Sequence, residues 1–244
     1  MFVLTADQHA SKVRGDKVAA LLDAQEGWDR AHADAVVLPL ERTVGDEVQI
    51  VLSDPSAAVD LALHLMRLGE WAVGIGAGPT DALAETSRAS SGPAFVHART
   101  AVERARGRAV PAPVVVTGED TSAAERATAL LQLLAAVVRR RSAPGWEVAD
   151  LLVGGALQKD VAATLGISEQ AVSQRVRSAM IEEERAVRPL AAELLTGAVG
   201  PSGTGPQARS RTGTGTGTGT PGTPGTPGTP GTGNDTPRVP KENR

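Results

Sequence analysis

The spacing of apolar residues changes once along the 244-residue chain, near Gly118, and this change constrains the fold more than any other feature. Before Gly118, apolar residues gather in short runs of strand length, separated by turn residues and amphipathic stretches. After Gly118 they recur every three or four residues over longer stretches, as on the buried face of a helix. The sequence therefore predicts a mixed α and β part followed by an all-helical part.

The first part, residues 1–118, has a simple order of elements. The predicted strands are residues 2–6, 35–40, 48–52, 71–75 and 114–116, and the predicted helices are residues 16–30, 55–68 and 91–106. Turn residues at 43–47 predict a hairpin, and Asp54-Pro55 is typical of a helix start. The order β-α-β-β-α-β, followed by α and β, is that of an α+β sandwich of the ferredoxin-like or palm type.

The second part, residues 119–190, is predicted to be helical. A long helix over residues 122–141 carries an apolar stripe that we expect to be buried, consisting of Leu130, Leu133, Leu134, Val137 and Val138. Pro144-Gly145 breaks this helix, and Gly154-Gly155 ends a short helix over residues 146–153. Two further helices are expected after it.

Composition excludes several classes of protein. Residues 197–244 are mainly Gly, Thr and Pro, so they bury too little surface to offset the entropy of ordering, and we expect a disordered tail. The chain has no cysteine, and its 25 Lys and Arg against 28 Asp and Glu give a net charge of −3. No signal peptide and no apolar run of about 18 residues is recognisable. We therefore expect a cytoplasmic protein with no membrane span, in which any DNA site is a local basic patch.

Residues 157–180 have the pattern of a helix-turn-helix. Gly166 suits the left-handed conformation of a sharp turn between two helices, and Ser168 suits the N-cap of the second one. Ala162 is small, which lets the second helix cross closely. The apolar residues expected in the core of this unit are Val161, Leu165, Ile167, Val172, Val176 and Met180.

The other face of the second helix is polar and suits hydrogen bonding to base edges or phosphates in a major groove. The candidate DNA-binding residues are Lys159, Ser168, Gln170, Ser173, Gln174, Arg175 and Arg177, with Arg139, Arg140 and Arg141 as further phosphate contacts. The alternative is an ordinary helical hairpin with a solvated face. Residues 158–162 and 171–176 resemble the helix-turn-helix of MarR-type regulators and of the promoter-reading region of sigma factors. This resemblance implies a transcriptional regulator that binds double-stranded DNA.

Three carboxylates are expected to meet at one corner of the first part. Asp7 follows the first strand, and Asp46 and Glu47 lie in the hairpin, which is a neighbouring position in a palm-type sheet. Carboxylates placed there can hold Mg²⁺ against a nucleotide phosphate. The helix start at Ser91 and Gly92 offers backbone N–H groups to an anion, and Arg99 follows one to two turns later. The alternative is that Asp7 caps a loop and that Asp46 only makes the turn.

The first part resembles the SatD-like family of bacterial proteins over about residues 1–106. The matching pieces are residues 6–8 followed by the basic Lys12 and Arg14, and residues 41–49, 73–78 and 91–99. Actinobacterial members of this kind join such a domain to a helix-turn-helix, so the resemblance implies the layout expected here.

The Gly-Asp-Glu turn also resembles that of nucleotide cyclases of the GGDEF class. Val44 stands where that class has a glycine, and Val48 replaces its aromatic residue. Val96 and Thr100 stand at the positions of the Asn and Arg of class III cyclases. These departures favour a ligand-sensing or structural domain over a cyclase.

Three functions remain open from the sequence. The first is a transcriptional regulator whose first domain forms a homodimer or senses a small molecule or nucleotide. The second is a Mg²⁺-dependent nucleotide enzyme that uses Asp7, Asp46 and Glu47. The third is an adaptor whose helices dock another protein.

Overall fold

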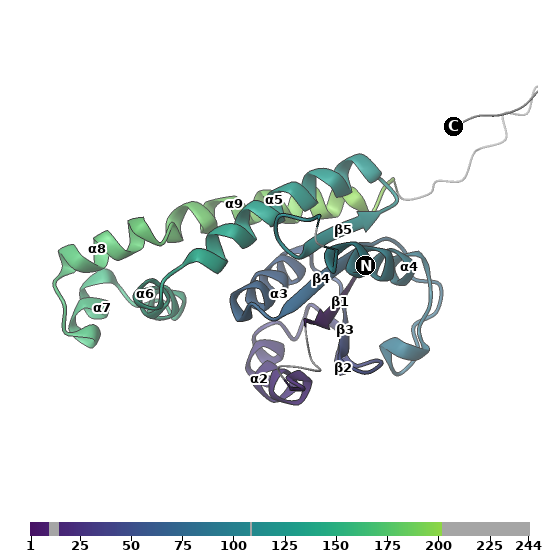
Figure 1. Ribbon diagram of the computed structural model, residues 1–244, viewed down its shortest axis with the longest axis horizontal. Helices are drawn as coiled ribbons and strands as arrows, with labels where there is room; N and C mark the ends of the chain where they lie inside the picture. The colour runs from purple at the N-terminus through teal and green to yellow at the C-terminus, as the bar shows by residue number, and fades with distance from the viewer. Residues whose placement is uncertain (10–14, 108, 202–244) are drawn as a thin grey trace, which may run out of the picture. The chain divides into compact units, whose positions relative to one another are not determined.

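The computed structural model describes residues 1–9, 15–107 and 109–201, and it is an α+β protein built on one mixed five-stranded sheet (Figure 1). The strand order is β2-β3-β1-β4-β5. The strands are β1 (Phe2–Gln8), β2 (Val36–Arg42), β3 (Glu47–Leu52), β4 (Trp71–Ala77) and β5 (Val114–Gly118). β1 is central and antiparallel to both β3 and β4, whereas β5 is parallel to β4 at the edge. The predicted order of strands and helices in the first part is confirmed.

Local signals in the sequence account for the helix that follows the hairpin. The Asp54 side chain accepts a hydrogen bond from the backbone N–H of Ser56 at 2.8 Å, and α3 (Pro55–Leu68) begins with a proline. The helix ends at Gly69, whose φ of 75° is a left-handed conformation that glycine adopts without strain. α3, α5 (Thr121–Arg140) and α9 (Ile181–Ala198) share one apolar core with the sheet face that carries Phe2, Leu4 and Ala6.

The opposite face of the sheet is covered by α4 (Pro93–Ala105), which lies close against β4. Gly74 and Gly76 make this approach possible, because a Cβ on either residue would overlap the backbone of α4. A Cβ on Gly76 would meet Ala94, at the start of α4, and one on Gly74 would meet Val102, near its end. α4 therefore runs antiparallel to β4. α2 (Val18–Ala31) packs beside β2.

Three short helices form a separate apolar cluster beyond the end of α5. They are α6 (Ala143–Val153), α7 (Gln158–Leu165) and α8 (Glu169–Ser178), and Figure 1 shows them at one end of the α5 and α9 pair. The buried residues of the cluster are Val148, Ala149, Val161, Ala162, Val172 and Val176 from these helices, together with Ala179 just after α8 and Ile181 at the start of α9. No helix in the described part of the chain is long and apolar enough to cross a membrane.

Three sequence predictions in the helical part need correction. Leu133 is 62% exposed, because the buried stripe of α5 runs through Leu131, Leu134 and Val138. Met180 is 44% exposed and has a left-handed φ of 51°, so Ala179 takes its place in the core. α9 reaches Ala198 and so continues into the predicted tail, of which residues 202–244 lie outside the described residues, as do Lys12 and Arg14.

Candidate functional site

The turn between α7 and α8 has the local geometry that its sequence predicts. α7 ends at Gly166, which has a left-handed φ of 64°. The Ser168 hydroxyl accepts a hydrogen bond from the backbone N–H of Ala171 at 3.1 Å and so caps α8. Val161 of α7 and Val172 of α8 are fully buried against each other's helices, which fixes how α8 is rotated.

The outward side of α8 is polar. Gln170, Gln174 and Arg177 are exposed, and Lys159 is exposed on α7. Arg177 donates to its own helix, through Nη2 to Ser173 Oγ at 3.2 Å and through Nε to the Ser173 carbonyl at 3.3 Å. These bonds hold the guanidinium along the helix surface, where its remaining N–H groups face solvent. The surface can therefore offer amide and guanidinium donors to a polyanion.

Two of the arginines predicted to contact phosphates form ion pairs with other residues of the protein. Arg175 Nη1 bonds Glu147 Oε2 of α6 at 3.1 Å, so its charge is already paired. Arg141 is buried and forms an ion pair with Glu184. Arg139 and Arg140 remain exposed at the end of α5. The local positive charge near α8 is therefore smaller than the sequence predicts.

The structure brings Asp7 and the hairpin carboxylates together. Asp7 lies directly opposite Glu47 in the β1–β3 register, and the N–H of Gln8 donates to the Asp46 carbonyl at 3.2 Å. Burial raises the pKa of Asp7 above its usual value; Arg106 opposes this shift, and the charges of Asp46 and Glu47 add to it. Within the described residues, no group of three or more His, Asp or Glu side chains is arranged to hold a metal ion.

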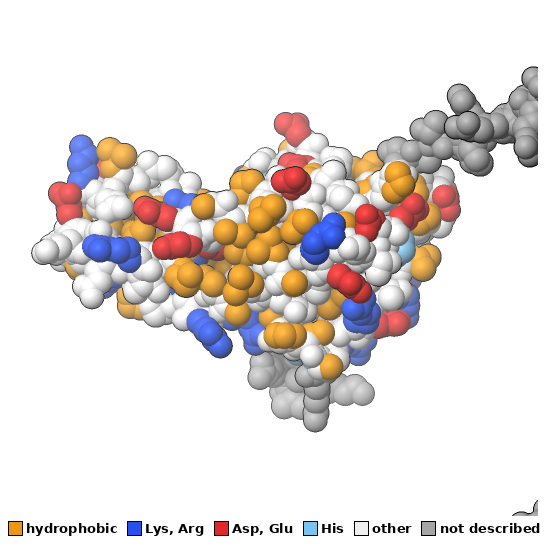
Figure 2. Space-filling model, turned by 90° about the horizontal axis from the view of Figure 1, so that it is seen from above, with side chains coloured by type: hydrophobic (Ala, Val, Ile, Leu, Met, Phe, Trp, Pro, Cys, Tyr) orange, Lys and Arg blue, Asp and Glu red, His pale blue; other side chains and the backbone are white. Residues whose placement is uncertain are grey.

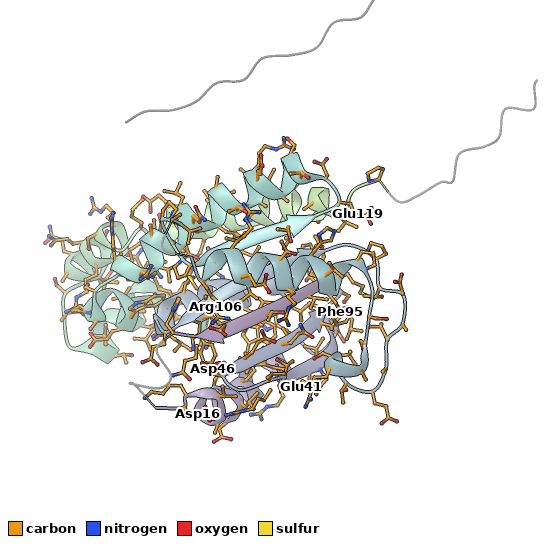
Figure 3. All side chains as sticks on the ribbon, turned by 45° about the vertical axis from the view of Figure 1, so that its right-hand side comes forward. Asp16, Glu41, Asp46, Phe95, Arg106 and Glu119 are labelled. Carbon is orange, nitrogen blue, oxygen red and sulfur yellow. The ribbon has the colours of Figure 1, made fainter. Side chains whose placement is uncertain are left out.

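The remaining pieces of the predicted nucleotide site lie elsewhere. Arg106, just beyond the end of α4, pairs with Asp7 at 3.2 Å, whereas Ser91 and Gly92 precede the start of α4, about 20 Å away along its 13 residues. The N–H groups of Ser91, Ala94 and Phe95 donate to protein carbonyls, so these groups are not free for an anion. Figure 3 shows Arg106 and Asp46 at one end of the sheet and Glu41 and Phe95 toward the other.

The chain matches no protein-family model, no curated protein and no solved structure.

A polar cavity of about 370 Å³ lies on the α4 side of the sheet, and Glu47 is the one of the three carboxylates that lines it. Its lining includes Thr5, Thr43, Glu47, Gln49, Ser87, Arg88, Phe95 and Arg99. Gln49 Nε2 donates to Thr5 Oγ1 at 2.8 Å, and Thr43 Oγ1 donates to Glu47 at 2.6 Å. Glu47 and Arg99 are among the residues predicted from the sequence, whereas Thr5 and Gln49 are not. Side chains alternate between the two faces of a sheet along each strand, so Thr5 lies on the same face as Asp7 in β1, and Gln49 lies on the same face as Glu47 in β3. This alternation could have predicted both residues.

The α6–α8 unit is joined to the sheet-bearing part by charged contacts. Arg67 of α3 makes two hydrogen bonds to the carboxylate of Asp150 in α6, at 2.6 and 2.8 Å. The same guanidinium lies over the ring of Trp146, 3.9 Å from its centroid. A bidentate Arg–carboxylate pair fixes orientation as well as distance. This pair therefore links α3 to α6, which packs against α8.

Proposed function

We propose that this chain is a sequence-specific regulator of transcription that binds double-stranded DNA through a helix-turn-helix formed by α7 and α8. The observation that carries the proposal is the polar face of α8, on which Gln170, Gln174 and Arg177 project from a helix held by buried valines. Gln suits paired hydrogen bonds to adenine, and Arg suits guanine. Because the chain is net acidic, specificity rests on this face rather than on bulk charge.

The first part acts as a ferredoxin-like, palm-type domain of the SatD-like kind, which dimerises or senses a ligand in the cytoplasm. The order β2-β3-β1-β4, with antiparallel neighbours and helices between the strands, supports the ferredoxin-like arrangement. The contact of Arg67 with Asp150 supports a link from this domain to the helix-turn-helix.

One observation favours a second candidate, a Mg²⁺-dependent nucleotide-binding or nucleotide-converting enzyme. Asp7 is buried beside Asp46 and Glu47, and carboxylates with a raised pKa are frequent at functional sites. Incubation with labelled ATP or GTP and Mg²⁺ tests it. Turnover that Asp7→Asn abolishes supports the enzyme. No turnover, together with no Asp7-dependent thermal shift by the nucleotide, removes it.

The experiment for DNA binding is a selection from random duplexes, followed by fluorescence anisotropy on the enriched site. Gln174→Ala and Arg177→Ala should each weaken specific binding by about 1–3 kcal/mol. Arg104→Ala is the control, because Arg104 is exposed on α4, which covers the face of the sheet opposite α5 and α9. If no sequence is enriched and affinity does not depend on salt, a protein-docking adaptor becomes the better account.

A further inference from the structure

The outer face of α5 and α9 exposes apolar side chains at its centre. Leu133 of α5 is 62% exposed and Leu190 of α9 is 48% exposed, and Val137 and Leu194 are half-buried. Figure 2 looks onto this face and shows a hydrophobic patch in its middle with charged side chains around it. A groove of about 410 Å³ lined by Leu133, Ala136, Val137 and Met180 continues the patch toward α8. Contiguous apolar patches of this kind mark interaction surfaces.

The two helices run antiparallel, as contacts at both ends show. At one end the N–H of Asp120 donates to the carbonyl of Ala198 at 3.3 Å. At the other end Arg141 pairs with Glu184. Leu133 and Leu190 each lie near the middle of their helix, between these two ends, and the two leucines form the centre of the patch.

The charges around the patch differ between the two helices. On α5, Arg126 and Arg140 lie seven residues before and after Leu133, on the same side of the helix. On α9, Glu183 lies seven residues before Leu190, and Glu193 lies one turn after it. Among the residues that the structure describes, Arg140, Glu183 and Glu193 have no ion-pair or hydrogen-bond partner for their side chains. The face is therefore basic along α5 and acidic along α9.

We propose that this face binds a second copy of the chain, with α5 of each copy lying on α9 of the other in an antiparallel four-helix bundle. The two-fold axis then runs along the helices, and Leu133 meets Leu190 of the second copy. Arg140 meets Glu183 of the second copy, and Arg126 lies near its Glu193. The other two-fold arrangement, α5 on α5, would set Arg126 against Arg140. The charges on the two helices therefore favour the first arrangement. It is isologous, which means that both copies contribute the same surface.

This arrangement has a consequence for the α6–α8 units. Because the axis runs along the bundle, both units lie at the same end of the dimer, related by the two-fold axis. Two copies of α8 presented in this way suit two half-sites of one duplex in an inverted repeat. The dimer itself rests on the α5 and α9 surface and is independent of the proposed DNA binding.

The test is the molar mass of the full-length chain without DNA, measured by light scattering and sedimentation from about 1 to about 100 µM. We expect a dimer. Leu133→Arg should yield a monomer with an unchanged circular dichroism spectrum, because the side chain is exposed in the single chain, and with a melting temperature that no longer depends on protein concentration. Leu68→Arg, at a 43% exposed leucine on α3, is the control and should remain dimeric.

A charge exchange tests the orientation. Arg140→Glu and Glu183→Arg should each weaken the dimer by about tenfold, and the double variant should recover most of that loss. A wild-type monomer at the highest concentration, or a dimer that Leu133→Arg leaves intact, would overturn the proposal. Failure of the double variant to recover would overturn the α5-on-α9 arrangement. If the chain is a monomer but still selects a DNA sequence, only the dimer proposal is wrong. If the chain is a dimer but selects no DNA sequence, only the proposed DNA-binding function is wrong.

Discussion

Arg141 and Glu184 form a buried ion pair, with Nη2 and Oε2 3.2 Å apart and side chains that are 2% and 3% exposed. Arg141 follows the end of α5, and Glu184 lies in the first turn of α9. The Nε of Arg141 also donates to the carbonyl of Ala179, just after α8, at 3.1 Å. One guanidinium therefore joins the end of the candidate DNA-reading helix to the two helices that pack on the sheet.

Removing one partner of this pair should be costly. We expect Arg141→Leu to lower the free energy of unfolding by about 3–5 kcal/mol, because it leaves the buried Glu184 with Arg188 as its remaining charged partner. Urea denaturation measures the change. The double variant Arg141→Leu/Glu184→Leu should recover most of the loss, since no uncompensated charge is then buried. A loss below about 1 kcal/mol for the single variant would contradict this account of the pair.

Gly74 should tolerate no side chain. Its Cβ would overlap the backbone of Val102, which cannot move without lifting α4 from β4, so Gly74→Ala should cost about 3 kcal/mol or more. Gly27→Ala is the matched control, because Gly27 lies in α2 with no atom within 4 Å of the added Cβ. The control should stabilise the chain by about 0.5–1 kcal/mol. Equal melting temperatures for the two variants would show that α4 does not depend on this close approach.

The sequence was sufficient where a local rule decides the structure. Asp54, Gly69, Gly166 and Ser168 each have one physical role, and each has it in the structure. It was insufficient for α5, where apolar residues occur on more than one side of the helix. The period alone could not tell that Leu131 is buried while Leu133 is exposed. Tertiary packing determines which of the two leucines is buried.

The pH dependence of stability should contain a contribution from His64 of α3. Burial, and then the charge of Arg67, lower the pKa of His64 below 6.5. Between that lowered pKa and 6.5 the unfolded chain binds more protons, so stability falls as the pH falls through this window. Urea denaturation from about pH 7.5 to about pH 5.5 should show a smaller loss for His64→Gln than for the wild type. Parallel curves for the two proteins would contradict the assignment.

Asp7 should oppose folding at neutral pH. Its raised pKa means that the folded chain favours the protonated carboxyl, so the cost of ionisation grows as the pH rises above 3.8 and is complete above the raised pKa. Asp7→Asn should therefore raise the free energy of unfolding at pH 7 and leave it nearly unchanged near pH 3. A loss of stability at pH 7 would mean that the pair with Arg106 outweighs burial.

The carboxylate corner shows the limit of sequence reasoning about a site. Asp7 lies opposite Glu47, as expected, because β1 and β3 are paired strands of one sheet. The partner of Asp7 is Arg106, at the end of α4, rather than Ser91 or Gly92 at its start. The direction of α4 over β4 decides this, because α4 runs back along β4 to reach the parallel strand β5.

Recognition of a DNA sequence by α8 is tested most directly by a selection from random duplexes, run in parallel on three proteins. We expect the wild type and Arg104→Ala to enrich the same motif, and Gln174→Ala/Arg177→Ala to enrich no motif or a relaxed one. Absence of any enriched sequence for the wild type, or the same motif from the α8 variant, would contradict recognition by α8.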